Sequence, residues 1–367
     1  ITRHAYAMAT QQRPRKVTLR DQIQDLPAYV PGARPRGTMS EKLSSNENPF
    51  PPLGRVLAAV TDAAADLNRY PDMHASELVS MLAQAHGLSD EQVVVGNGSV
   101  AVLENILEAL CEPGDEVVMA WRSFEAYPIA VAVAGGTPVQ VPVLADGCHD
   151  VEAMVAAVTD QTKAMLLCSP NNPTGPALTG AEVAYVLEHL PRHVMVLLDE
   201  AYIEFVTHPD AVDSIPLIEA DPRLVVLRTF SKAYGLAGLR VGYALGRSRL
   251  ISGFRAASTP FGVNALAQVA AMESLRAHAE LMERVASIVT ERERLLAGLR
   301  DQGWQIPDAQ GNFVWLELKE RTGAFAQECA AAGGLVRPFA GEGVRISIGD
   351  RDGSDLVLEV ASRFRSV

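Results

Sequence analysis

Cysteine is scarce in this sequence. The 367 residues include four cysteines, which lie far apart, and no Cys-x-x-Cys pair or neighbouring group of histidines is present. Neither a disulfide framework nor a zinc site is therefore indicated, and we assign no metal ligands. Dispersed thiols are typical of a reducing compartment, so the expected location is the cytoplasm.

Long apolar runs are missing as well. No stretch approaches the roughly 20 consecutive apolar residues that a membrane helix needs, so no membrane partner is expected. The start of the chain lacks the uninterrupted apolar core of a signal peptide. We consider Met8 a candidate for the natural start, with residues 1–7 added to it.

Basic residues do not predominate. The 32 Lys and Arg are outnumbered by 44 Asp and Glu, which gives a net charge of −12. Because a protein with a net negative charge repels nucleic acids and anionic membranes, neither is expected as the main partner. The sequence also lacks an internal repeat. A small-molecule partner is the expectation that remains.

Apolar residues are abundant, and their pattern predicts an α/β fold. At 48% of the chain they suffice for a large domain and a smaller companion. Short apolar runs alternate with helical patterns, which is typical of a mainly parallel sheet flanked by helices. The strands are predicted at residues 93–95, 116–119, 138–143, 164–168, 194–199, 224–228 and 241–245.

The pattern changes along the chain in a way that suggests three regions. Residues 1–70 are rich in Pro, Arg and Asn and predict an arm that packs with the small domain and a second subunit. Residues 71–263 form the predicted large domain. Residues 264–367 predict a small α+β domain, with one long helix ending near Arg300 and strands at 313–318, 335–338 and 344–348. Thr179 and Glu182 predict a capping box.

Polar residues follow two of the predicted strands, at the edge where open α/β sheets bind ligands. Residues 168–175, Cys-Ser-Pro-Asn-Asn-Pro-Thr-Gly, hold two asparagines between prolines; a plain turn is the alternative interpretation. Asp199 ends a buried strand and needs a compensating partner, such as a protonated ring nitrogen. A helix cap is the alternative for this aspartate. Tyr202, three residues on, is close enough to meet a neighbouring phenolic oxygen.

Lys232 lies in a glycine-bearing segment, residues 227–240, that also carries Thr229, Ser231 and Arg240. An amine buried beside another cation loses its proton more readily, and the neutral amine is the form that attacks an aldehyde. The hydroxyls and the guanidinium are donors for a dianion. The alternative is an ordinary solvated loop lysine.

The predicted helix start at Gly98, Ser99, Val100 and Ala101 offers backbone N–H groups to a phosphate. It has neither a Walker lysine nor a Gly-x-Gly-x-x-Gly sequence, so a nucleotide is not specifically indicated. Phe124, just after the next strand, would stack on a flat ring, although core packing is the alternative for a lone aromatic residue.

Together these features match pyridoxal 5′-phosphate, which needs an anion site, a stacked ring, a carboxylate at its ring nitrogen, a donor at its ring oxygen and a lysine. The sequences Asn-Pro-Thr-Gly, Asp-Glu-Ala-Tyr and Ser-Lys-Ala-Tyr-Gly-Leu-Ala-Gly-Leu-Arg occur in order. In these motifs the chain resembles the fold-type I aminotransferases, in the branch of histidinol-phosphate aminotransferases and actinobacterial aromatic amino acid aminotransferases. The resemblance runs from about Leu43 to the C-terminus.

The resemblance implies the fold of the type I pyridoxal-phosphate-dependent transferases and roles for particular residues. Lys232, Asp199 and Tyr202 are the expected catalytic residues, with Lys232 bound to the cofactor, Asp199 at its ring nitrogen, and Tyr202 with Asn172 at its ring oxygen. The other residues expected at the cofactor are Ser99, Val100, Ala101, Thr229, Ser231 and Arg240 near its phosphate and Phe124 against its ring.

Tyr70, Arg345 and Asn48 receive roles from the same resemblance, and Asn172 is expected at the substrate as well. Arg337 receives its role from its closeness in sequence to Arg345. Tyr70 matches a tyrosine that reaches the phosphate from the other subunit, which implies a homodimer. Arg345 matches the residue that grips the anionic end of the substrate, in keeping with the fork geometry of a guanidinium. Arg337 is expected to add a second cation, although a surface arginine is the alternative. Asn48 is expected at the substrate in a lid-like segment, residues 44–50.

The residues of these motifs resemble the actinobacterial aromatic enzymes more closely, which favours an aromatic amino acid as donor, with phenylpyruvate-type acceptors. Histidinol phosphate with 2-oxoglutarate stays open as the alternative, because both donors combine a flat ring with an anion. A related lyase or decarboxylase is a third hypothesis. A ligand-sensing regulator is a fourth, although neither terminus has room for a DNA-binding module or a basic face.

Overall fold

A seven-stranded sheet forms the centre of the computed structural model, which describes residues 17–24, 26, 28, 32 and 41–365. Its strand order is β2-β8-β7-β6-β5-β3-β4, and β8 alone runs antiparallel to its neighbours. The strands are β2 (Val93–Gly96), β3 (Glu116–Trp121), β4 (Thr137–Pro142), β5 (Thr162–Cys168), β6 (Met195–Asp199), β7 (Leu224–Thr229) and β8 (Gly242–Leu245). The predicted strands and the mainly parallel mixed sheet are confirmed.

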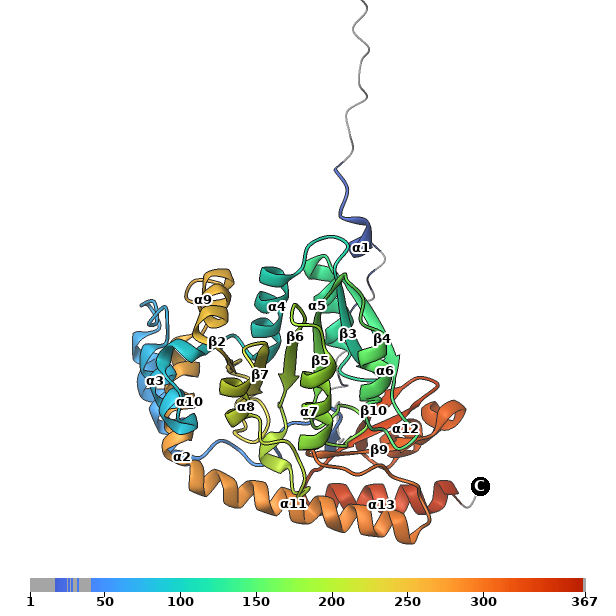
Figure 1. Ribbon diagram of the computed structural model, residues 1–367. Helices are drawn as coiled ribbons and strands as arrows, with labels where there is room; N and C mark the ends of the chain where they lie inside the picture. Colours follow the sequence, from blue (N-terminus) through green and yellow to red (C-terminus); the bar gives the residue numbers. More distant parts are fainter. Residues whose placement is uncertain (1–16, 25, 27, 29–31, 33–40, 366–367) are drawn as a thin grey trace, which may run out of the picture.

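Helices cover both faces of this sheet (Figure 1). Because side chains alternate along a strand, Val117 and Met119 of β3 pack towards one helical layer and Val118 packs towards the other. The first layer contains α4 (Ser99–Leu110), α5 (Ala126–Ala134) and α9 (Ser248–Ala257). The second contains α6 (Val151–Ala156), α7 (Gly180–His189) and α8 (Ile215–Ala220). The sheet is therefore buried on both sides.

The predicted capping box at the start of α7 is present. The hydroxyl of Thr179 accepts a hydrogen bond from the backbone N–H of Glu182 at 3.2 Å. The carboxylate of Glu182 in turn accepts one from the backbone N–H of Thr179 at 2.7 Å. This reciprocal pair satisfies two donors that the helix itself leaves without partners.

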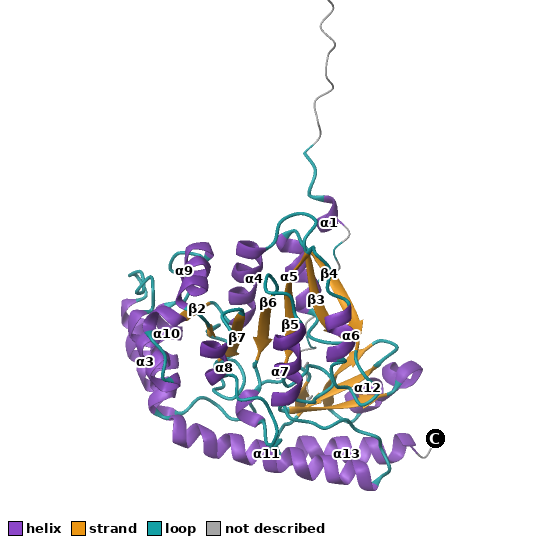
Figure 2. Cartoon of the chain, in the orientation of Figure 1, coloured by secondary structure: helices purple, strands orange, loops and turns teal. Residues whose placement is uncertain are grey.

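A second sheet, of four strands in the order β1-β10-β11-β9, lies beside the carboxyl ends of the large one (Figure 2). Its strands are β1 (Glu41–Leu43), β9 (Phe313–Glu317), β10 (Gly334–Phe339) and β11 (Gly343–Ser347). The three strands predicted near the C-terminus are confirmed. The fourth strand comes from the N-terminal part of the chain, since β1 pairs in parallel with β10.

One prediction about a helix is wrong in part. The stretch predicted as one long helix is divided at Ala277 into α10 (Ala265–Arg276) and α11 (His278–Asp301), because Ala277 leaves the helical conformation at φ −100° and ψ 20°. The predicted arm contains a regular helix, α2 (Gly54–Ala63), which packs on α10. The parts of the arm at residues 1–16 and 33–40 lie outside the described residues.

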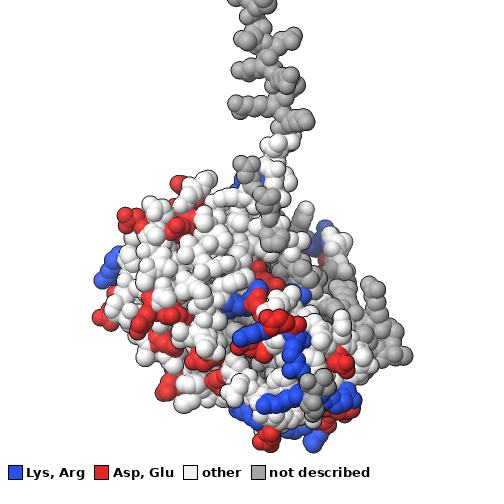
Figure 3. Space-filling model, turned by 90° about the vertical axis from the view of Figure 1, so that its right-hand side faces the viewer, with Lys and Arg blue, Asp and Glu red and all other residues white. Residues whose placement is uncertain are grey.

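The remaining elements are short or peripheral. They are α1 (Asp21–Gln24), α3 (Ser76–His86), α12 (Thr322–Ala331) and α13 (Arg351–Arg365), with the 3₁₀ helices η1 (Ala64–Asp66), η2 (Asp90–Gln92), η3 (Ile203–Phe205) and η4 (Lys319–Arg321). In the part of the chain that the structure describes, every helix is too short or too polar to cross a membrane. On the face that Figure 3 presents, basic side chains lie mainly at the lower right among acidic ones, and acidic side chains predominate along the left rim.

Candidate active site

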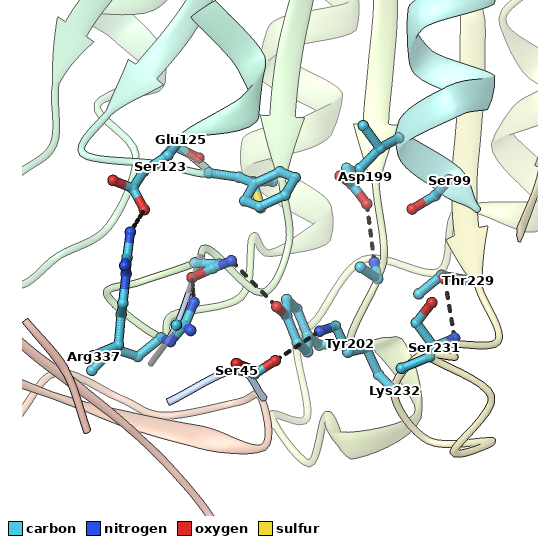
Figure 4. A pocket seen from close by; sticks show the side chains of 18 of the residues that line it. Ser45, Ser99, Ser123, Glu125, Asp199, Tyr202, Thr229, Ser231, Lys232 and Arg337 are labelled. Atoms are coloured by element: carbon cyan, nitrogen blue, oxygen red, sulfur yellow. Dashed lines mark hydrogen bonds and ion pairs between the residues drawn. The ribbon is translucent and has the colours of Figure 1, made fainter. Parts of the chain in front are cut away.

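A cavity of about 240 Å³ lies where the carboxyl ends of β5, β6 and β7 face the small sheet (Figure 4). It collects most of the predicted site residues, although they are spread over more than half of the chain. The predicted residues that line it are Ser99, Val100, Phe124, Asn172, Asp199, Tyr202, Thr229, Ser231, Lys232, Arg240, Arg337 and Arg345. Ala101, Tyr70 and Asn48 do not line it.

Lys232 lines this cavity and is partly buried. Its Nζ donates to the backbone oxygen of Ser45 at 3.3 Å and lies 5.6 Å from the centre of the Tyr202 ring. Burial lowers the pKa of Lys232 to about 7, and the nearby guanidinium groups of Arg345 and Arg240 contribute to this. The amine is therefore substantially neutral near neutral pH, as a nucleophile or a general base must be. Burial beside a cation was the expected cause of this shift, and of the two contributions burial is the larger.

Asp199 ends β6 inside the same cavity. Burial raises the pKa of Asp199 to about 6. Hydrogen bonds to its carboxylate act in the opposite direction: Tyr127 Oη donates to Oδ2 at 2.7 Å, and the backbone N–H of Ala201 donates to Oδ1 at 3.2 Å. Because a cation near this carboxylate would favour its ionised form further, Asp199 is suited to a protonated nitrogen of a ligand.

Tyr127 is a site residue that was not predicted from the sequence. It lies on α5, one turn after Phe124, and the two rings meet edge to face with centres 5.4 Å apart. A buried tyrosine needs a partner for its hydroxyl. Its position shortly after the end of β3, at the edge predicted to bind ligands, was the signal available in the sequence.

A hydrogen-bond network joins the two sheets at Tyr202. Asn172 and Asn46 each donate an amide N–H to Tyr202 Oη, at 3.3 Å and 3.1 Å. Arg345 donates to Asn172 Oδ1 at 2.6 Å and to the backbone oxygen of Ser44 at 2.8 Å. Burial raises the pKa of Tyr202, so its hydroxyl keeps its proton and is available as a donor. Asn46 and Ser44 had not been assigned from the sequence.

The start of α4, the end of β7 and the loop between β7 and β8 together form an anion-binding site, which we call the anion seat. This loop, residues 230–241, carries Lys232 and is called the lysine loop. Gly98 precedes the helix at φ +89°, and a Cβ at this position would collide with Nη2 of Arg240. Arg240 donates to Ser231 Oγ at 3.2 Å, and the backbone N–H of Ser231 donates to Thr229 Oγ1 at 3.1 Å. Arg240 itself has a left-handed backbone, with φ 58°. The guanidinium, the hydroxyls and the positive end of α4 at Ser99 are a donor set that fits a phosphate.

Arg337 and Arg345 enter the cavity from the small sheet. They are directly opposite each other on the antiparallel strands β10 and β11. Arg337 Nη2 lies 2.7 Å from Oε2 of Glu125, the residue before α5. The ring of Phe339 lies near both guanidinium groups, with its centre 5.3 Å from Cζ of Arg337 and 6.0 Å from Cζ of Arg345.

Three predicted residues lie elsewhere. Tyr70 is 83% exposed, and its ring lies against Phe261 with centres 4.7 Å apart. Asn48 donates to the backbone oxygen of Ala233 at 2.9 Å, so its amide supports the lysine loop, where a substrate contact had been expected. Ala101 is one residue further into α4 and lines a different groove, which Met73 also lines.

Comparisons with known proteins agree with this geometry. The family described as aminotransferase class I and II matches residues 39–360. An aromatic amino acid aminotransferase of Streptomyces avermitilis is 49% identical over 349 residues, which are 95% of this chain and 97% of the relative. One from Thermobifida fusca is 52% identical over 348 residues, 94% of this chain and 97% of the relative.

A solved structure also covers nearly the whole chain. The histidinol-phosphate aminotransferase from Sinorhizobium meliloti, in complex with pyridoxal-5'-phosphate, is 27% identical, with a TM-score of 0.83 and 99% coverage of both chains. Since the family match extends over most of the sequence and the relatives share about half of its residues, this chain belongs to the class I and II aminotransferases.

Proposed function

We propose that this aminotransferase moves the amino group of an aromatic amino acid to a 2-oxo acid of the phenylpyruvate type, with pyridoxal 5′-phosphate as cofactor. The supporting observation is the cavity that unites a partly buried lysine of lowered pKa, a buried carboxylate and an anion seat. The choice of an aromatic donor is supported by the relatives that are named for it.

The donor set fits the cofactor. Lys232 would hold its aldehyde carbon, and Asp199 would hold a proton at its ring nitrogen. Asn172 and Tyr202 would donate to its ring oxygen, and Phe124 would lie against the ring. The residues for its phosphate are Ser99, Val100, Thr229, Ser231 and Arg240. When bound, the cofactor supplies an electron sink that stabilises negative charge at the α-carbon of the substrate.

The protein's own groups then bind and move protons. Arg345 would bind the substrate carboxylate through its guanidinium fork, next to Asn172. Lys232, whose amine is substantially neutral near pH 7, would take the α-carbon proton and later return a proton, acting as general base and then acid. Tyr127 would keep Asp199 ionised and correctly oriented.

Histidinol phosphate is the second candidate donor. It is supported by the close similarity in fold to a histidinol-phosphate aminotransferase, although at lower sequence identity than the aromatic relatives. The same cavity groups would serve both reactions, so the geometry favours neither by itself.

A half-reaction test separates the two donors. The cofactor-loaded enzyme is mixed separately with phenylalanine, histidinol phosphate and glutamate, and the absorbance of the lysine-bound cofactor is followed. Phenylalanine is expected to bleach this band at the lowest concentration. If histidinol phosphate does so instead, the aromatic assignment is wrong and the alternative holds.

We further propose that the active form is a homodimer. Tyr70 and Phe261 are 83% and 39% exposed and lie against each other, and Met73, 45% exposed, lines the adjoining groove. Exposed apolar residues grouped in this way mark an interaction surface. A second copy would cover them and bring Tyr70 towards the phosphate of its partner.

The cytoplasm is the proposed location. All four cysteines are free thiols, and Cys111, Cys168 and Cys329 are buried. Free thiols are typical of a reducing compartment.

A further inference from the structure

The two arginines of the small sheet have different partners. Arg337 and Arg345 are directly opposite on β10 and β11 and both line the cavity. Like charges in this arrangement repel each other, so a nearby anion stabilises the pair. Glu125 is such an anion for Arg337, at 2.7 Å. Arg345 donates to uncharged acceptors, Asn172 Oδ1 and Ser44 O.

The Glu125–Arg337 ion pair is largely shielded from water. The Arg337 side chain is 9% exposed and that of Glu125 is 28% exposed. At this depth a charge that loses its partner is poorly compensated by solvent. Figure 4 draws the pair on the side of the cavity away from Ser99, Thr229 and Ser231, where the anion seat lies. The pair therefore faces the part of the cavity that is left for the substrate.

The position of Glu125 affects ligands according to their charge. A second anionic group on the substrate, such as the side-chain carboxylate of glutamate, would have to displace Glu125 from Arg337, and Glu125 would also repel it. An uncharged aromatic side chain of the substrate needs no such displacement. It could pack against the ring of Phe339, which lies beside both guanidinium groups. The α-carboxylate that all amino acids share would still bind to Arg345.

We propose that Glu125 is a specificity-determining residue. By neutralising Arg337, it favours substrates with an uncharged side chain over substrates that carry a second anionic group. This inference rests on the proposed function and deepens it, because it assigns the preferred substrate class by charge.

A second ion pair at the same junction provides a matched control. Arg122, three residues before Glu125, pairs with Glu342 in the turn between β10 and β11. Glu342 is 37% exposed and lines a separate groove on the outside of the molecule. Removing its charge breaks an ion pair between the two sheets without changing the charge of the cavity.

Two unreactive ligands test the proposal in the cofactor-loaded enzyme. Glutarate has two carboxylates, and 3-phenylpropanoate has one carboxylate and a phenyl ring. Each is titrated while the cofactor absorbance is recorded, and the ratio of glutarate affinity to 3-phenylpropanoate affinity is compared between variants. Glu125→Gln is expected to raise this ratio about tenfold, whereas Glu342→Gln should leave it within about twofold of wild type.

A second variant keeps the test decisive if Glu125→Gln does not fold. Arg337→Ala leaves the carboxylate of Glu125 in the cavity without this cation, so the ratio should fall below that of wild type. In kinetics, Glu125→Gln should raise kcat/KM for glutamate relative to phenylalanine, mainly through KM.

Several results would overturn the proposal. They are an unchanged ratio in Glu125→Gln, an equal rise in Glu342→Gln, or a rise that persists when Arg337→Ala is added to Glu125→Gln. Failure of the proposed function is a different observation, namely a wild-type enzyme that does not transaminate phenylalanine. A wild-type enzyme active on phenylalanine with an unchanged ratio in Glu125→Gln contradicts the specificity role alone.

Discussion

At the scale of single residues, burial sets the charges of the site. It lowers the pKa of Lys232 to about 7 and raises the pKa of Asp199 to about 6. Between these two values the carboxylate is already mostly ionised while the amine is still mostly protonated. Above about pH 7 the site holds a neutral amine and a carboxylate, which is the combination that the proposed chemistry needs.

This ordering predicts how the cofactor-free protein captures pyridoxal phosphate. Only the neutral amine reacts, so the capture rate should rise with pH through about 7 and then level off. An exposed lysine, with a pKa of about 10.4, would still show a rising rate at about pH 9. Rapid-mixing absorbance measurements across this pH range check the prediction, and a rate that keeps climbing tenfold per pH unit above about pH 8 contradicts it.

Tyr127 should stabilise the bound cofactor through Asp199. Replacing it with Phe removes the 2.7 Å hydrogen bond to Oδ2, and a hydrogen bond to a charged group contributes about 1.5–3 kcal/mol. We expect Tyr127→Phe to raise the pKa of Asp199 further and to weaken cofactor binding about tenfold or more.

Equilibrium titration with pyridoxal phosphate measures this effect. Tyr185→Phe is the control, because Tyr185 lies on α7 and stacks on His189, away from the cavity. Wild-type cofactor affinity in Tyr127→Phe would show that this hydroxyl does not support Asp199.

At the scale of elements, the close approach of α4 to the lysine loop depends on glycine. Gly98→Ala should displace the Arg240 guanidinium, which occupies the space that the added methyl group would need, and should strain a backbone at φ +89°. We expect a loss of about 1 kcal/mol or more in unfolding free energy and a larger loss of cofactor affinity.

Gly180→Ala is the matched control for this variant. Gly180 begins α7, and no atom of the described residues lies within 4 Å of an added Cβ. Thermal melts with and without cofactor should separate the two variants, with Gly180→Ala close to wild type. A Gly98→Ala protein with wild-type cofactor affinity would contradict the proposal that the anion seat binds the cofactor phosphate.

The helices and strands show how much of the fold could be predicted from the sequence. The central strands were located to within about two residues, because strands buried on both faces form continuous apolar runs bounded by turn residues. The break at Ala277 was missed because the surrounding residues, Leu275-Arg276-Ala277-His278, contain neither glycine nor proline. The pairing of β1 with β10 joins residues almost 300 positions apart, from Glu41 to Gly334, and no local pattern reports it.

Prediction of the site from the sequence has the same limit, because contacts between distant residues leave no local pattern. The motif residues Asn172, Asp199 and Lys232 were brought together as expected because each lies at or just after the end of a strand of the same sheet. Tyr127 and Glu125 were missed, since their partners Asp199 and Arg337 are 72 and 212 residues away and the pairing depends on how the two sheets are placed.

At the scale of the whole molecule, the exposed pair Tyr70 and Phe261 predicts self-association. Sedimentation should give twice the chain mass of 39.4 kDa. Phe261→Arg should shift the protein towards monomer and lower activity, because a charge is costly to bury in an apolar interface. Leu144→Arg, which alters an apolar residue 46% exposed outside this pair, is the control. A wild-type monomer with full activity would contradict the homodimer.

The assignment of Lys232 as the cofactor-binding lysine is tested most directly by Lys232→Ala. Wild-type protein mixed with pyridoxal phosphate should develop the absorbance of a lysine-bound cofactor, and borohydride reduction should fix the label on the peptide that contains Lys232. Lys232→Ala should develop neither this band nor turnover, whereas Lys163→Ala, the control at a lysine that does not line the cavity, should keep both. A Lys232→Ala protein that keeps both the band and transamination would contradict the assignment.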